Sequence, residues 1–172
     1  TNDLVGQLPS ELRGLSPLQT LELPGNSITG PLPPAIGQIG NLTSLDLSEN
    51  FLTGNLPATL AGASSLESLV LDVNNFFGNI PPEINQLTSL RTLDVGDNLL
   101  DGVIPQLALA ELGKLPKVKQ ATNQKRIFSH AWDFFHTEVL DLRGNSFIGP
   151  LPNPTSLPSL AQLNVAQNAL TG

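Results

Sequence analysis

The 172-residue sequence predicts an α/β fold, a single solenoid domain made of stacked coils. Asparagines recur every 24 residues, at positions 2, 26, 50, 74 and 98, and the pattern resumes at positions 145 and 168. Alternating apolar residues, as in Leu45-Asp46-Leu47, precede these asparagines from position 26 onward and have the period of a strand with one buried side. A Gly and a Pro follow at constant distances, as Gly54 and Pro57 follow Asn50. A fixed period of this length is typical of repeat architectures.

Each part of the unit has a physical role. The Asn side chain carries both a donor and an acceptor, so it is expected to satisfy backbone groups of its own coil and of the next coil. The Gly is expected at a turn that needs a positive φ or a close backbone approach. The Pro fixes an extended segment. The remaining eight residues, such as PAIGQIGN, have apolar residues about three apart and predict a short helical or 3-10 return.

One unit cannot fold alone. Ordering its 24 residues costs roughly 1–2 kcal/mol each, whereas five to seven buried Leu or Ile side chains return about 1.5–3 kcal/mol apiece. Coils must therefore stack and share a core. We expect one domain over residues 1–172, with repeats starting near 18, 42, 66, 90, 115, 137 and 160, the unit at 115–136 being degenerate. Because the chain starts and stops partway through a unit, we expect it to be a fragment of a longer protein.

The unit LxxLxLxxNxLTGxLPxxLxxLxx resembles the plant-type leucine-rich repeat, which occurs in receptor-kinase ectodomains and polygalacturonase inhibitors. This resemblance implies a right-handed superhelix with a parallel β-sheet on the concave side and short helical or 3-10 turns on the convex side. It also implies a second strand segment in the T-G-x-L-P half of each unit. An extracellular or cell-surface location follows from the same resemblance.

Composition argues against several functional classes. The net charge of −7 disfavours binding to nucleic acid, which needs a basic surface. No run of eighteen apolar residues occurs, so this segment is not expected to contact a membrane. The absence of Cys excludes disulfides, thiolate nucleophiles and Cys-ligated zinc. Phosphate-binding loops and the G-x-S-x-G motif are also absent, so we predict a non-enzymatic protein without a cofactor.

The stretch FSHAWDFFHTE at 128–138 departs from the repeat. No regular geometry brings His130, Asp133 and His136 together, so neither a metal site nor a catalytic site is predicted there. On a helix, one apolar stripe would be formed by Phe128, Ala131, Trp132 and Phe135. The stripe could cover the core where the coil is degenerate. Alternatively, Trp132 or Phe134 is exposed and docks a partner.

The candidate binding surface is the concave face. Residues between the strand leucines and just before the Asn should point outward, about 4.8 Å from their counterparts on the next coil. The predicted contact residues are Glu22, Asp46, Glu49, Val70, Asp72, Asp94, Asp97, Lys117, Lys119, Asp141 and Arg143. Val70 and Val73 interrupt an acidic region, and Lys119 is expected between Asp94 and Asp141. Lys117, Lys119 and Arg143 are expected to make the C-terminal end of the concave face basic.

Two interpretations of this face remain open. Its side chains could be solvated strand positions, with Asp141 and Arg143 forming a local pair of little energetic value. As a docking surface, its charge pattern would select an oppositely charged protein or peptide partner. The leading hypothesis is the extracellular region of a receptor-like protein. The alternatives are an inhibitor of a secreted enzyme and a structural or adhesion protein. One N-x-T sequence, Asn41-Leu42-Thr43, is a candidate glycosylation site.

Overall fold

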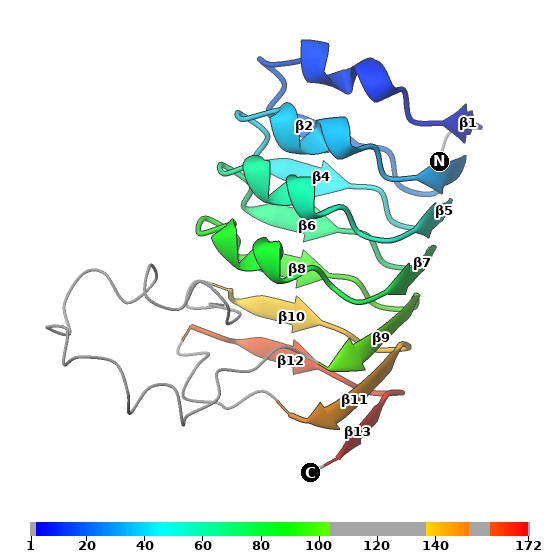
Figure 1. Cartoon of the computed structure of the whole chain (residues 1–172), viewed down its shortest axis with the longest axis vertical. Helices are drawn as coiled ribbons and strands as arrows, with labels where there is room; N and C mark the ends of the chain where they lie inside the picture. Colours follow the sequence, from blue (N-terminus) through cyan, green and yellow to red (C-terminus); the bar gives the residue numbers. More distant parts are fainter. Residues whose placement is uncertain (1–2, 104–136, 152–158, 172) are drawn as a thin grey trace, which may run out of the picture.

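The chain forms a solenoid in which successive coils stack along one axis (Figure 1). The structure is a computed structural model, and it describes residues 3–103, 137–151 and 159–171. A complete coil contains a strand, a second strand and a 3-10 helix, in that order. The predicted solenoid of parallel strands and short 3-10 turns is confirmed.

The strand that precedes each Asn belongs to a parallel sheet, which has six strands in the described part of the chain. These strands are β2 (Thr20–Glu22), β4 (Ser44–Asp46), β6 (Ser68–Val70), β8 (Thr92–Asp94), β10 (Val139–Asp141) and β12 (Gln162–Asn164). They pair in register, so that Leu45 lies beside Leu21 on one side and beside Leu69 on the other. The middle Leu of β4, β6, β8 and β10 is buried, and its neighbours are half-buried except for Asp141 in β10, which is buried.

The half of the unit that follows the Asn builds a second parallel sheet, with seven strands among the described residues. They are β1 (Val5–Gln7), β3 (Ser27–Pro31), β5 (Phe51–Gly54), β7 (Asn75–Gly78), β9 (Leu99–Val103), β11 (Ser146–Pro150) and β13 (Ala169–Thr171). The expected second strand segment is therefore present. In the strands from β1 to β11, the repeated Gly ends or interrupts the strand with a positive φ, as at Gly54 (φ 89°), a conformation that side chains disfavour.

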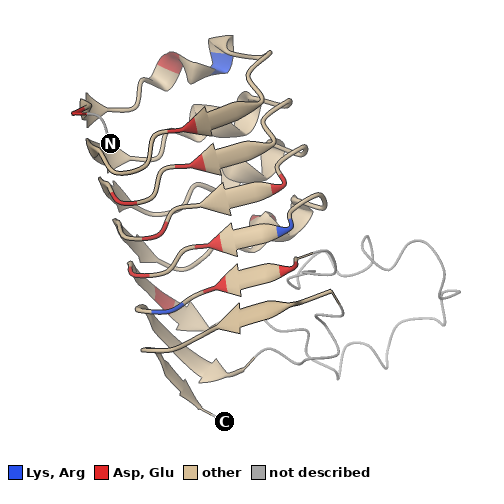
Figure 2. Ribbon diagram, turned by 180° about the vertical axis from the view of Figure 1, so that it is seen from behind, with Lys and Arg blue, Asp and Glu red and all other residues tan. Residues whose placement is uncertain are grey.

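The predicted return segments are 3-10 helices. They are η1 (Ser10–Gly14), η2 (Pro34–Gln38), η3 (Ala58–Gly62) and η4 (Pro82–Gln86). Extended prolines such as Pro33 and Pro57 precede them and set the direction in which the chain turns. The helices lie on the opposite side of the solenoid from the six-stranded sheet (Figures 1 and 2). The described ranges contain no candidate membrane-spanning helix.

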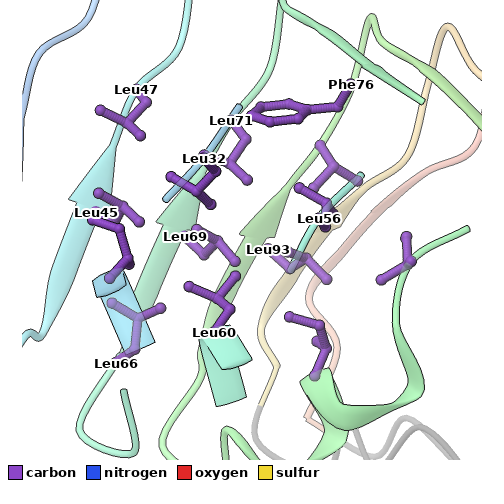
Figure 3. Close-up of a cluster of buried hydrophobic side chains, with 14 of the residues drawn as sticks. Leu32, Leu45, Leu47, Leu56, Leu60, Leu66, Leu69, Leu71, Phe76 and Leu93 are labelled. Atoms are coloured by element: carbon purple, nitrogen blue, oxygen red, sulfur yellow. The ribbon is translucent and has the colours of Figure 1, made fainter. Parts of the chain in front are cut away.

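Leucines from successive coils fill the space between the sheets and the 3-10 helices (Figure 3). Leu47, Leu71 and Val95 are buried at equivalent positions, and Leu23 on the first of these coils packs against them while half-buried. Side chains at the same position therefore form inward columns, as the sequence predicts. Each coil covers the apolar side chains of its neighbour, which explains why one coil could not be stable alone.

The repeated asparagines form a ladder along the stack. In Asn50, Oδ1 accepts a hydrogen bond from the backbone N–H of Ile28 (3.0 Å), and Nδ2 donates to the carbonyl oxygens of Leu23 (2.9 Å) and Leu47 (3.1 Å). Asn74 and Asn98 repeat this pattern. The sequence predicted bonds to the Asn's own coil and to the next one. In the structure, each of these Asn side chains bonds to its own coil and to the preceding coil, not to the next one.

The stack corrects the expected position of the degenerate coil. Strand β8 pairs directly with β10, and Asn145 Oδ1 accepts the backbone N–H of Leu100 (2.9 Å). Asn98 and Asn145 are 47 residues apart in sequence yet one coil apart in the stack, so the chain between them has 23 residues more than the 24-residue period. The prediction that Lys119 lies between Asp94 and Asp141 is wrong, because those two residues are register neighbours. Outside the described residues lie Lys117, Lys119, Trp132, Phe134 and the histidine-containing stretch 128–136.

Candidate binding face

The outward side chains of the six-stranded sheet, together with those of the residues between each strand and its Asn, form one surface, which we call the strand face. Figure 2 shows acidic residues gathered along it, near the ends of the strands. The pairing aligns Glu22 with Asp46, Asp46 with Val70, and Val70 with Asp94. The predicted residues of the first coils are thus brought together on one surface. Asp141 continues the row beside Asp94.

Three acids of this row also hold the turn after their strand. The carboxylates of Asp46, Asp94 and Asp141 each accept the backbone N–H two residues further on, at 3.0 Å. This is an Asx-turn, in which a short acidic side chain replaces a backbone partner. Glu22 occupies the same position but stands two residues before Pro24, which has no N–H to offer. The sequence did contain a signal for these turns: an Asp at the end of the strand, followed two residues later by a residue that has a backbone N–H. Sequence reasoning assigned these aspartates to the binding face and missed their role in closing the turn.

A second row stands just before each Asn and has left-handed backbone geometry. Glu49, Val73 and Asp97 have φ values of 53°, 54° and 49°. Glycines occupy the equivalent position at Gly25 and Gly144, where φ is also positive. Asp tolerates this conformation comparatively well, whereas a β-branched residue such as Val is a true outlier. The row was predicted to face outward, but its strained backbone was not predicted.

Arg143 lies within the acidic region and compensates part of its negative charge. Its Nε donates to Asp97 (2.9 Å), its Nη1 donates to Asp141 (3.1 Å), and its Nη2 lies 3.7 Å from Asp72 Oδ2. The hydrogen bond to Asp97, followed by the charge of Asp141, raises the pKa of Arg143 above its usual value. Arg143 therefore serves as a shared counter-ion. Arg143 therefore does not make this end of the strand face basic, contrary to the prediction from sequence.

Burial changes the acid strength of two carboxyls on the strand face. It is the main cause that raises the pKa of Asp94 to about 6, and the charges of Asp72 and Asp141 add to the effect. The Gly96 N–H bond and Arg143 oppose it. Burial likewise raises the pKa of Asp72, against the attraction of Arg143. The charge of this part of the face therefore changes between neutral and mildly acidic pH.

The acids of the first coils have no such counter-ion. Within the described ranges, Glu22, Asp46 and Glu49 form no salt bridge, although Ser48 Oγ donates to Asp46 (2.7 Å) and Ser44 Oγ donates to Glu22 (3.3 Å). Their negative charge is left for solvent or a partner. No group of three or more His, Asp or Glu side chains in the described part of the chain is arranged to hold a metal ion.

The candidate glycosylation site lies at the edge of the solenoid. Asn41 is exposed, and its Nδ2 donates to the carbonyl oxygen of Ser16 (2.9 Å) on the preceding coil. Thr43 Oγ1 donates to the carbonyl oxygen of Gln19 (2.9 Å). A glycan on Asn41 would replace one of the two Nδ2 hydrogens and leave one N–H to donate, and glycosylation stays a prediction.

A family model described as a leucine-rich repeat region matches residues 1–171. The ectodomain of the plant membrane receptor kinase GASSHO1/SCHENGEN3 from Arabidopsis thaliana, solved with CASPARIAN STRIP INTEGRITY FACTOR 2, is similar over 100% of this chain, with 30% identity and a TM-score of 0.81. The plant peptide hormone receptor RGFR1, solved with RGF2, is similar over 99%, with 30% identity and a TM-score of 0.79. The Arabidopsis receptor kinase HAESA, solved with the peptide hormone IDA and the co-receptor SERK1, is similar over 99%, with 27% identity and a TM-score of 0.78.

This chain spans 18%, 24% and 25% of those three chains, respectively. Among curated protein sequences, none matches it.

Proposed function

This chain belongs to the plant-type leucine-rich-repeat proteins, and we propose that it is a non-catalytic recognition module that binds a protein or peptide on its strand face. The observation that carries this proposal is the row of outward side chains held at fixed spacing on a rigid sheet. Its backbone positions are set by strand pairing and by the asparagine ladder. Side chains on the face that do not close a turn, such as Glu22 and Glu49, can therefore vary without disturbing the core, as a recognition surface requires.

The charge of the face favours a partner with basic groups. Glu22, Asp46 and Glu49 form no salt bridge among the described residues, whereas Arg143 compensates the acids of later coils. A partner that brings Lys or Arg to the first coils would satisfy these carboxylates. Such complementarity contributes mainly to selectivity and to the rate of association.

Similar structures support the class of partner. The receptors that resemble this chain include a plant peptide hormone receptor solved with RGF2 and a receptor kinase solved with a peptide hormone and a co-receptor. We therefore propose that this chain is part of the extracellular region of a receptor-like protein. A peptide in extended conformation could lie along the stack and contact successive coils, because coils repeat about 4.8 Å apart and its residues advance by about 3.3–3.6 Å each.

Charge reversal on the two sides of the solenoid tests this proposal. The probe is a phage-displayed library of random 12-residue peptides selected on the wild-type protein. We expect Glu22→Lys/Glu49→Lys to abolish binding of most enriched clones. The matched control is Glu11→Lys/Glu83→Lys, which alters net charge equally but changes acids on the 3-10 helices η1 and η4. Equal loss in both variants, or in neither, would contradict recognition by the strand face.

A further inference from the structure

Val73 is the residue of the strand face that the fold explains least. Its backbone is left-handed, with φ 54°, and the residue is 44% exposed. A β-branched residue in this conformation is a genuine outlier, with a cost of order 1–2 kcal/mol. Glycine, which incurs no such cost, occupies the equivalent position at Gly25 and Gly144. A glycine at position 73 would therefore avoid the strain, yet this coil has Val there.

Among the described residues, the hydrogen bonds of Val73 involve its backbone and not its side chain. The Val73 N–H donates to the Gly96 carbonyl oxygen (3.0 Å), and its own carbonyl oxygen accepts the N–H of Asn50 (3.2 Å). Glycine would make both of these backbone bonds. The exposed isopropyl group also gains little from the apolar core. Strain that the fold does not need points to a role in contact with another molecule.

The surroundings of Val73 define what that molecule must carry. Val70, half-buried at the end of β6, adds a second apolar side chain on the same coil. On the preceding coil, carboxylates occupy the corresponding positions, Asp46 beside Val70 and Glu49 before its Asn. On the following coil, Asp97 is already bonded to Arg143. The apolar pair therefore has unpaired negative charge on its N-terminal side.

We propose that Val70 and Val73 receive one apolar side chain of a peptide ligand, and that a Lys or Arg one or two residues away in that peptide pairs with Glu49 and Asp46. This inference rests on the proposed function and names its ligand class, an apolar-basic peptide. Neighbouring coils are about 4.8 Å apart, whereas successive residues of an extended peptide advance by about 3.3–3.6 Å. Contacts on two adjacent coils therefore require neighbouring or next-neighbouring side chains.

The test uses the clones selected from the random 12-residue library. Among clones that lose binding in Glu22→Lys/Glu49→Lys, we expect enrichment of an apolar residue within two positions of Lys or Arg. For the corresponding synthetic peptides, Val73→Gly should weaken affinity about tenfold, because the apolar contact is lost. Glu49→Gln should weaken it about threefold at low salt, and high salt should abolish that difference.

The controls separate recognition from folding. Val73→Gly relieves backbone strain, so a loss of affinity cannot be attributed to unfolding. Val73→Thr keeps the branched shape but replaces one methyl group with a hydroxyl group, and should weaken binding to a similar extent. Gln167→Gly changes the equivalent position on a distant coil, where φ is 56°, and should leave affinity unchanged.

Each outcome decides between the two proposals. Clones that depend on the strand face but are unaffected by Val73→Gly and Glu49→Gln would overturn this inference and leave the proposed function intact. If none of the enriched clones depended on the strand face, both proposals would fail. Clones that need Val73 but contain no basic residue would also overturn the inference, since its charge requirement would be wrong.

Discussion

Replacing Asn74 with Ala tests the claim that the asparagine ladder holds neighbouring coils together. Asn74 is 7% exposed, and its side chain makes four hydrogen bonds. Oδ1 accepts the backbone N–H of Leu52 (2.9 Å), while Nδ2 donates to the carbonyl oxygens of Leu47, Leu71 and Asp72. Substitution with Ala removes all four bonds at once.

The four bonds do not contribute equally to the expected loss. Each of the three carbonyl oxygens keeps another donor: Asn50 Nδ2 bonds Leu47, Asn98 Nδ2 bonds Leu71, and the Glu49 N–H bonds Asp72. The N–H of Leu52 loses its side-chain acceptor, and Leu52 is fully buried. An unsatisfied buried N–H costs about 1–3 kcal/mol. With roughly 1 kcal/mol for the missing side-chain volume, the free energy of unfolding should fall by about 2–4 kcal/mol.

The adjacent residue supplies the control. Asn75 has an exposed side chain on β7, so Asn75→Ala should change the free energy of unfolding by less than about 0.5 kcal/mol. Urea unfolding monitored by circular dichroism measures both variants, and the midpoints are comparable only if the slope with denaturant is unchanged. If Asn74→Ala cost as little as is expected of Asn75→Ala, the argument would be refuted, because water would then satisfy the Leu52 N–H in the variant.

Three further predictions concern the strand face and the stacking of coils. Because the pKa of Asp94 is raised to about 6 by burial, the folded state holds its proton more tightly than the unfolded state, and stability should fall as pH rises from about 4 through 6. Asp94→Asn should flatten this dependence, measured as the free energy of unfolding against pH, and Asp46→Asn should leave most of it in place. Val73→Gly should maintain stability or raise it by about 0.5–1 kcal/mol, since relief of strain exceeds the greater chain entropy of Gly; a lower melting temperature would contradict the assigned strain. Gly37→Ala should cost about 1–3 kcal/mol or more, because a Cβ there overlaps the Thr59 carbonyl oxygen, whereas Gly40→Ala, which meets open space, should be nearly neutral in the same melting experiment.

The sequence predicted those parts of the fold that depend on period and burial. Leu47, Leu71 and Val95 form the expected inward column, since a fixed period places equivalent side chains side by side. The outward positions of Asp46 and Asp94 followed from the same alternation. Both results require only that each coil repeats the path of the one before it.

Other features could not be obtained from the period. Arg143 was expected to form a basic end because its coil was counted as two units beyond Asp94. In the structure, β8 pairs directly with β10, so no coil separates Asp94 from Asp141. Arg143 therefore lies within hydrogen-bonding distance of Asp97. Sequence spacing gives distance along the chain, whereas position in the stack depends on which coils pair. The left-handed backbone of Val73 was equally hidden, because Val does not mark such a conformation in sequence as Gly would.

The acids of the strand face fall into two groups that mutation must keep separate. Asp46 and Asp94 accept the N–H that closes the turn after their strand, so replacing either with Lys removes a structural bond as well as a charge. Lost binding in such a variant would not distinguish a missing ligand contact from a displaced turn. Glu22 and Glu49 are exposed, and neither carboxylate accepts a turn N–H among the described residues. Reversing their charge changes what the face offers a partner while the coils stay in place. Recognition on this surface is therefore best tested at its glutamates and at Val73, and stability at its aspartates.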